Sequence, residues 1–251
     1  MGRVVIIGAG PGAADLITLR GARLLAQANV VLFDALTDPA LRELAPDARW
    51  LDVGKRGFTD STGQPTIDAL MVRCALEVDV VVRLKGGDPS VFGRLEEELE
   101  ALARAGIACE VVPGVTSALA AAASSLRPLT RRGSGRSVSF ATAMTRTGAL
   151  HASRTADTEV FYMAGKQLDA LPQRLVDAGW SGDTPVSVVS RAGWPDQRHS
   201  EHSVATLPDA AALHAGRPTI VTVGAGAQPL HIANRVDAPH GTDTPVETLK
   251  T

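Results

Sequence analysis

Short apolar runs alternate with longer amphipathic segments along the first half of this sequence, and no other feature restricts the possible folds as strongly. The apolar runs have the length and aliphatic content of buried strands, and they lie at 3–8, 30–34, 80–84 and 108–113. The segments between them have helical periodicity, and they lie at 15–28, 67–77 and 96–106. Because successive strands joined by a helix run parallel, the pattern predicts an α/β fold with a parallel-rich sheet.

A second pattern begins near Ser137, where the strand-like runs are richer in serine and threonine and lie closer together. These runs lie at 137–142, 159–164, 185–190, 202–207 and 218–224, with a helical segment at 168–180. The close spacing favours a mixed sheet. We therefore expect two α/β domains, 1–113 and 114–235, a flexible tail at 236–251, and an active-site cleft between the domains.

Charge and hydropathy exclude several classes of protein. The formal net charge is −2 over 251 residues, so no overall positive field attracts nucleic acid or an anionic membrane. No apolar run approaches the roughly 18 residues that a membrane-spanning helix requires. The residues after Met1 lead directly into a strand-like run, which predicts no secretory signal and a cytoplasmic protein. Cys74 and Cys109 lie far apart in aliphatic surroundings, so we expect two buried free thiols and no metal site.

Three glycine-containing loops follow predicted strands of the first half, GAGPG at 8–12, GGDP at 86–89 and PGVTSA at 113–118. Glycine lets backbone N–H groups approach a ligand closely, and open α/β sheets bind ligands at the carboxyl ends of their strands. Asp88 could accept hydrogen bonds from hydroxyl groups or offset a cation. We therefore expect the three loops to converge on one small ligand.

A dinucleotide-binding enzyme is an alternative interpretation of the same loops. Gly8, Gly10 and Ala13 match the fingerprint of such sites, and Asp34 follows at about the spacing, some 20 residues, of a ribose-binding acid. This pattern allows an NAD(P)-dependent oxidoreductase. Pro11 argues against it, because proline removes an N–H group that a pyrophosphate would use.

Purely structural roles are also open for these segments. Residues 8–12 could form a tight turn that binds nothing. Asp88 and Pro89 have the form of a helix N-cap followed by proline at the first helical position. Met163, in the run VFYMAG, has the surroundings of a residue that simply fills the core.

Seven motifs occur in an order and at intervals that resemble one known family. They are VVIIGAGPG, VVLFDAL, VGKRG, RLKGGDPSVFGR, VVPGVTSALAA, PLTRRG and FYMAG, and they extend over roughly Val4 to Gly224. In this order they resemble the uroporphyrinogen-III C-methyltransferases of the tetrapyrrole methylase superfamily. The resemblance implies two α/β domains, a homodimer and S-adenosyl-L-methionine as methyl donor. It also implies methylation of uroporphyrinogen III to precorrin-2, via precorrin-1, in sirohaem or cobalamin biosynthesis.

The resemblance assigns the donor site residue by residue. The family's donor contacts correspond here to Pro11, Gly86, Gly87, Asp88, Val91, Thr116, Ser117, Met163 and Ala192. An apolar pocket lined by backbone suits methyl transfer from a sulfonium, because the charge disperses in the transition state. S-adenosyl-L-homocysteine is the implied product of the donor.

The implied acceptor is a large macrocycle bearing several carboxylates, so the resemblance requires cations near these loops. The candidates are Lys55, Arg56, Arg94, Arg127, Arg131, Arg132 and Arg136. Arginine pairs bidentately with carboxylates, and Lys55, Arg94 and Arg132 match substrate-side positions of the family, whereas Arg136 is expected to be solvated. The resemblance further offers Asp34 as proton acceptor and Lys55 as general acid, with Arg94 and Glu97 close to the acceptor.

Several positions depart from the pattern of the family. Ala35 replaces an arginine, Arg131 a histidine and Met144 another histidine, while SRAG at 190–193 replaces a segment resembling ENGT. These changes fall mainly on the acceptor side or in the second half. Two further hypotheses therefore stay open, a methyltransferase for another precorrin or tetrapyrrole, and a donor-binding protein without catalytic activity.

Overall fold

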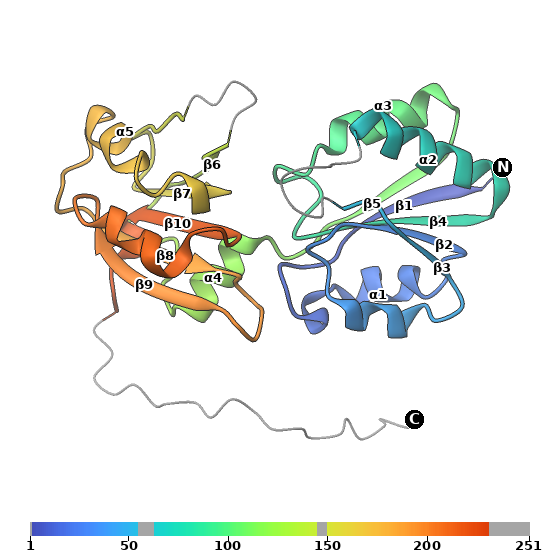
Figure 1. Ribbon diagram of the computed structural model, residues 1–251, viewed down its shortest axis with the longest axis horizontal. Helices are drawn as coiled ribbons and strands as arrows, with labels where there is room; N and C mark the ends of the chain where they lie inside the picture. Colours follow the sequence, from blue (N-terminus) through green and yellow to red (C-terminus); the bar gives the residue numbers. More distant parts are fainter. Residues whose placement is uncertain (1, 55–62, 145–149, 231–251) are drawn as a thin grey trace, which may run out of the picture.

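The computed structural model of the chain describes residues 2–54, 63–144 and 150–230. Two α/β units, each built on one five-stranded sheet, lie side by side along the long axis of the molecule (Figure 1). The chain passes from the first unit to the second after the last strand of the first sheet (Figure 1). The expected two-sheet α/β fold is therefore confirmed, whereas the tail expected at 236–251 lies outside the described residues.

The first sheet is entirely parallel, with the strand order β3-β2-β4-β1-β5. Its strands are β1 (Arg3–Gly8), β2 (Val30–Phe33), β3 (Arg49–Asp52), β4 (Val80–Lys85) and β5 (Cys109–Val112). Its helices are α1 (Leu19–Leu25), α2 (Gln64–Glu77) and α3 (Leu95–Arg104). Helices α2 and α3 cover one face of the sheet and α1 covers the other (Figure 1).

Strand β1 shows why the sequence forms this buried sheet. Val4 and Ile6 pack in one apolar cluster with Met71 of α2. Ile7 points to the opposite face and packs in a second cluster with Leu25 of α1. All five side chains are fully buried, and burial of each such side chain is worth about 1.5–3 kcal/mol. A strand with both faces covered therefore has no polar alternation and appears as one continuous apolar run.

The second sheet is mixed, as expected, with the strand order β6-β7-β10-β8-β9. Its strands are β6 (Val138–Thr142), β7 (Thr158–Tyr162), β8 (Pro185–Ser190), β9 (Arg198–Ser203) and β10 (Thr219–Gly224). Only β6 and β7 pair in parallel, and the remaining pairs are antiparallel. The helices of this unit are α4 (Ser117–Ser124), α5 (Leu171–Asp177) and α6 (Ala211–His214).

Short 3-10 helices connect several of these elements. They are η1 (Ala14–Leu16), η2 (Pro39–Leu44), η3 (Ala164–Lys166), η4 (Leu207–Ala210) and η5 (Ala225–Ala227). Among the described helices, none combines the length and the apolar character that a bilayer crossing requires.

The helix expected at 15–28 is much shorter in the structure. Residues Ala14–Leu16 form a 3-10 turn, and α1 begins only at Leu19. The hydroxyl oxygen of Thr18 accepts a hydrogen bond from the N–H of Gly21 at 3.1 Å, so Thr18 is the N-cap. The apolar periodicity continues through the break, which is why the sequence does not reveal it.

Two edge strands and one cysteine also differ from expectation. β3 (Arg49–Asp52) was not expected, because its sequence RWLD is polar and partly exposed. β9 (Arg198–Ser203) occupies the polar run RHSEHS and shares only residues 202 and 203 with the expected strand at 202–207, whose remainder forms a turn and the start of η4. Edge strands need little apolar surface, so polar sequences suffice for them. Cys74 is buried as expected, but Cys109 is exposed, because β5 is also an edge strand.

Candidate active site

The three glycine loops lie together because their strands are neighbours in the sheet. β1 lies between β4 and β5, so the carboxyl ends of these three strands meet at one edge. The N–H of Gly87 donates to the carbonyl oxygen of Gly10 at 2.7 Å, and the reverse bond measures 3.3 Å. A Cβ on Gly8 would lie 2.6 Å from the Cα of Gly114, so only glycine permits this packing. The loops are thus joined backbone to backbone.

Asp88 ties two of these loops together. Its Oδ1 accepts a hydrogen bond from the N–H of Ser90 at 2.8 Å, and its Oδ2 accepts one from the N–H of Gly114 at 2.9 Å. The next helix, α3, begins only at Leu95. Asp88 is therefore not a helix N-cap, and that structural interpretation of the sequence was wrong.

The second half of the chain closes over the same loops. The N–H of Ala13 donates to the carbonyl oxygen of Gly193 at 2.8 Å, and a Cβ on Gly12 would lie 2.6 Å from the carbonyl carbon of Gly193. The hydroxyl groups of Thr116 and Tyr162 are hydrogen-bonded at 2.8 Å. These contacts hold the two sheets against a common space.

That space is a cavity of about 190 Å³ with walls from both halves of the chain. All nine residues that the resemblance assigns to the methyl donor line it, namely Pro11, Gly86, Gly87, Asp88, Val91, Thr116, Ser117, Met163 and Ala192. They come from five separate parts of the sequence, so their convergence depends on the tertiary fold. The resemblance thus predicted most of the first-half wall and four residues of the second-half wall.

The cavity also has lining residues that the sequence did not single out. They are Leu36, Phe92, Tyr162, Arg191, Trp194, Pro218, Thr219 and Ile220. Tyr162 and Arg191 adjoin the predicted Met163 and Ala192, so proximity in sequence could have indicated them. Residues 218–220 open an ordinary apolar strand, β10, and no local signal distinguishes them.

Unfavourable backbone conformations are concentrated around this cavity. Five of the described non-glycine residues have positive φ, and three of these line the cavity, Phe92 at 53°, Met163 at 58° and Arg191 at 51°. Such conformations cost free energy and cluster at functional sites. Met163 is also 41% exposed. It is therefore not the core-filling residue that its sequence surroundings suggested.

The second-half wall carries a charged cluster behind the lining. The guanidinium of Arg191 lies over the ring of Trp194, with its carbon 4.4 Å from the ring centroid. Its Nε donates to Asp196 Oδ1 at 2.7 Å, and Arg217 donates to Asp196 Oδ2 at 3.1 Å. Arg191 and then Arg217 hold the pKa of Asp196 below its ordinary value. This side of the cavity thus presents the ring of Trp194, stacked on an arginine whose charge is balanced by Asp196.

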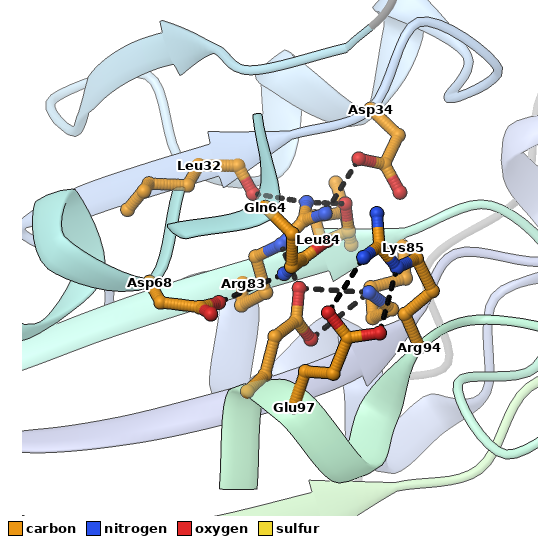
Figure 2. Close-up of polar contacts among 10 residues, drawn as sticks. Leu32, Asp34, Gln64, Asp68, Arg83, Leu84, Lys85, Arg94 and Glu97 are labelled. Carbon is orange, nitrogen blue, oxygen red and sulfur yellow. Dashed lines mark hydrogen bonds and ion pairs between the residues drawn. The ribbon is translucent and has the colours of Figure 1, made fainter. Parts of the chain in front are cut away.

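Four charged side chains form a second polar centre beneath the same edge of the first sheet (Figure 2). Arg83 donates from Nη2 to Asp34 Oδ1 at 2.6 Å and from Nε to Glu98 Oε1 at 2.9 Å. Lys85 Nζ donates to both oxygens of Glu98, at 2.8 and 2.9 Å. Arg83, Lys85 and Glu98 are buried, whereas Asp34 is partly exposed. We refer to these four residues as the charged chain.

Among the predicted catalytic residues, Asp34 belongs to this charged chain, and Arg94 and Glu97 lie beside it (Figure 2). Arg94 donates to Glu97 through two hydrogen bonds, of 2.9 and 2.6 Å, and both side chains are about half exposed. They are therefore paired with each other at the surface and do not line the cavity. Lys55 and its neighbour Arg56 lie outside the described residues.

The basic segment at 127–136 does not act as one cation cluster. Arg127 is buried, donates to the carbonyl oxygen of Ala227 and pairs with Glu201. Arg131 donates to the carbonyl oxygen of Gln228. Both arginines therefore already bind other parts of the chain, and their role toward substrate carboxylates stays a prediction. Arg132 and Arg136 are exposed, and neither lines the cavity.

The geometry does not fit the dinucleotide interpretation. The first loop leads into the 3-10 turn at Ala14–Leu16 rather than into a helix N-terminus that could hold a pyrophosphate. The N–H of Ala13, which such a ligand would use, donates to Gly193 instead. Asp34 is bound to Arg83 and is not among the cavity residues.

Comparison with known proteins places the chain among methyltransferases. The family model of the tetrapyrrole (corrin/porphyrin) methylases matches residues 3–208. A uroporphyrinogen-III C-methyltransferase of Pseudomonas aeruginosa is 41% identical over 228 residues, which are 89% of this chain and 93% of that protein. A siroheme synthase of Psychrobacter cryohalolentis is 41% identical over 220 residues, which are 85% of this chain. The chain spans only 42% of the length of that synthase.

Solved structures agree in fold. The crystal structure of uroporphyrin-III C-methyl transferase from Thermus thermophilus, complexed with S-adenyl homocysteine, superposes with a TM-score of 0.78 at 36% identity and covers 89% of this chain and 97% of that one. With a matching family model over most of its length and relatives of this identity, the chain belongs to the tetrapyrrole methylase family.

Proposed function

We propose that this chain transfers methyl groups from S-adenosyl-L-methionine to uroporphyrinogen III, giving precorrin-1 and then precorrin-2. The single observation that carries the proposal is the convergence of nine family-assigned residues on one cavity between the two sheets. The similarity to a uroporphyrinogen-III C-methyltransferase over 93% of its length supports the same acceptor. The similarity to siroheme synthases supports a place in sirohaem biosynthesis.

The cavity has the chemistry that a sulfonium donor needs. Its first-half wall consists of glycine backbone and the side chains of Pro11, Leu36, Val91 and Phe92, with Asp88 as its one acid. No atom lies within 4 Å of the Cβ position of Gly87, so a side chain there would enter the open space. When bound, the donor supplies an electrophilic methyl group, and an apolar wall favours the loss of its charge in the transition state.

The charged chain and its neighbours form the acceptor side in this proposal. Asp34 accepts the proton that the macrocycle loses after the new carbon–carbon bond has formed, which restores conjugation in the ring. Arg94 lies in the turn that follows the Gly87 loop, and it can exchange Glu97 for a substrate carboxylate because both side chains are exposed. Lys55 is proposed as the general acid, and Arg132 as a further contact for carboxylates.

The test is direct conversion. Purified protein is incubated anaerobically with uroporphyrinogen III and methyl-labelled donor, and the product is examined by mass spectrometry for two added methyl groups. Formation of precorrin-2 is the expected result. Tight binding of S-adenosyl-L-homocysteine without methylated product would instead favour a donor-binding protein without catalysis.

A second acceptor is favoured by one comparison. The structure of cobalt precorrin-4 methyltransferase, CbiF, superposes with a TM-score of 0.79 at 32% identity, as closely as the uroporphyrinogen enzymes do. Together with the changes at Ala35, Arg131 and Met144, this makes later precorrins the next substrates to examine. Product formation from a later precorrin but not from uroporphyrinogen III would change the acceptor and leave the donor site unaffected.

The proposal includes a homodimer, as the family resemblance implies. Light scattering of the purified chain at several concentrations measures the mass directly. A monomer at all concentrations would remove this part of the proposal.

A further inference from the structure

The charged chain is costly to bury, and the spacing of its residues along β4 and α3 places their side chains on one face of the sheet. Arg83 and Lys85 are two residues apart on β4, so both point to the α3 face of the sheet. Glu98 lies on that face of α3 and is fully buried, and the side chains of Arg83 and Lys85 are only 3% and 5% exposed. Apolar residues of similar volume would serve stability at least as well as buried ion pairs do. The arrangement therefore calls for a role other than stability.

Each of the three nitrogens of the Arg83 guanidinium donates a hydrogen bond. Nε donates to Glu98 at 2.9 Å, Nη2 donates to Asp34 at 2.6 Å, and Nη1 donates to the carbonyl oxygen of Leu84 at 3.1 Å. The planar guanidinium thus has no freedom to turn. Lys85 binds both oxygens of Glu98, which fixes that carboxylate from its other side. Lys85 thus orients Glu98, Glu98 orients Arg83, and Arg83 orients Asp34.

Asp34 is the only member of the charged chain that reaches solvent, with 31% of its side chain exposed. Its Oδ1 is held by Arg83, while Oδ2 accepts no hydrogen bond from any residue that the structure describes. Leu36, two residues further along, lines the donor cavity, and its Cβ lies 3.3 Å from where a Cβ added to Gly86 would be. Within the described residues, one oxygen of Asp34 is therefore fixed and the other has no hydrogen-bond donor, two positions along the chain from a residue that lines the cavity.

We propose that Arg83 and Glu98 are positioning residues that fix the Asp34 carboxylate so that its free oxygen, Oδ2, takes the proton from the methylated macrocycle. The inference rests on the proposed function and deepens it. In this step the C–H bond of the cationic ring breaks, its electron pair restores the conjugated system, and the proton forms an O–H bond to Oδ2. Arg83 and Glu98 touch neither substrate nor donor.

The charges around Asp34 agree with this division of roles. Burial lowers the pKa of Arg83, but Asp34 and Glu98 outweigh burial, so its pKa lies above the ordinary value. Burial and then Arg83 lower the pKa of Lys85, against the pull of Glu98. Arg83 thus keeps its charge throughout the working pH range. The other charged groups that Figure 2 draws alongside are Asp68 of α2, which accepts from Gln64 at 2.8 Å, and the exposed Arg94–Glu97 pair.

The main test replaces Arg83 by lysine, which keeps the positive charge but cannot reach Asp34 and Glu98 together. We expect kcat to fall at least tenfold and the acid limb of the kcat/KM profile to move to higher pH. The Kd of S-adenosyl-L-homocysteine, measured by calorimetry, should stay within about twofold. Glu98→Gln is expected to lower kcat in the same way but not to move the acid limb to higher pH, because it removes a negative charge. Glu100→Gln, at an exposed residue on the same helix, is the matched control and should change nothing.

Two results would overturn the proposal. One is a folded Arg83→Lys enzyme with unchanged kcat and pH profile. The other is a variant in which activity, donor affinity and the midpoint of urea unfolding all fall together, because that result indicates a merely structural role. If the single variants do not fold, Lys85→Met with Glu98→Met removes one charge of each sign, and the same readouts apply to it. A wild-type chain that makes no product contradicts the proposed function itself, whereas active wild type with unaffected variants contradicts only the positioning role.

Discussion

His214 should make the second half of the protein sensitive to acid. The ring is fully buried, and its nitrogens are hydrogen-bonded to two serine hydroxyls, Nδ1 to Ser190 at 2.8 Å and Nε2 to Ser200 at 2.8 Å. Burial, followed by the nearby His202 and Arg217, lowers its pKa from 6.5 to about 4. The folded protein therefore holds this imidazole neutral over a pH range in which the unfolded chain protonates it.

The size and sign of the effect follow from this difference in pKa. Between pH 6.5 and 4 the unfolded state binds more protons than the folded state, so the free energy of unfolding falls as the pH falls. Each pH unit in this window costs about 1.4 kcal/mol, which gives a loss of about 2 kcal/mol at pH 5 and about 3 kcal/mol below pH 4. Above pH 6.5 His214 contributes no pH dependence.

The assay is urea unfolding of the wild type and of His214→Gln at pH 7.5 and pH 5, followed by tryptophan fluorescence. Trp180 packs in the same apolar core as the strands around His214 and reports on this half of the chain. Wild type should lose about 2 kcal/mol more than the variant between the two pH values. His151→Gln, at an exposed position, is the control and should behave like wild type. Equal losses in wild type and His214→Gln would refute the reasoning.

Three further substitutions test the site and the core. Gly87→Ala puts a side chain into the open space of the cavity at a φ of +73°. It should weaken the binding of S-adenosyl-L-homocysteine, measured by calorimetry, at least tenfold. The control Gly106→Ala, with a φ of +67° and equally open space outside the cavity, should leave this binding unchanged. Asp34→Asn should lower kcat by about 10²–10⁴-fold, the usual worth of a general base, with the Kd of S-adenosyl-L-homocysteine retained; unaltered turnover would exclude Asp34 as the base. Phe161→Ala, in the centre of the second core, should cost about 3–5 kcal/mol in urea unfolding, and a smaller loss would mean that the core collapses around the gap.

The fold of the first half could be predicted because its strands are buried on both faces. A continuous aliphatic run such as 3–8 has no other stable place than the middle of a covered sheet. β3 and β9 escaped prediction for the opposite reason, because an edge strand is held by backbone hydrogen bonds to one neighbour and tolerates a polar sequence. The start of α1 escaped because the break at Ala14–Leu16 leaves the apolar periodicity intact.

The candidate site divides in the same way. Glycines such as Gly8 mark their loops in the sequence, because close backbone packing, here against Gly114, leaves no room for a side chain. The charged chain left no such mark, since Glu96, Glu97 and Glu98 are consecutive and only the rotation of α3 decides which of them is buried. Sequence reasoning assigned a role to Glu97, which lies at the surface, and overlooked Glu98, which holds Arg83.

The structure separates a nearly neutral donor cavity from a strongly charged acceptor side, and the separation suits the chemistry. Among the described residues that line the cavity, only Asp88 and Arg191 are ionic, and both are engaged, Asp88 by the N–H groups of Ser90 and Gly114 and Arg191 by an acid behind the wall. A free anion beside a sulfonium would stabilise the bound donor more than the transition state, in which the positive charge has moved away, and would slow the transfer. In the proposed mechanism the charge that the reaction does need, a base for the departing proton, is supplied by Asp34, which is not among the residues that line the cavity. The proposal thus assigns methyl transfer and proton loss to different electrostatic environments at one sheet edge, joined by the two-residue step from Asp34 to Leu36.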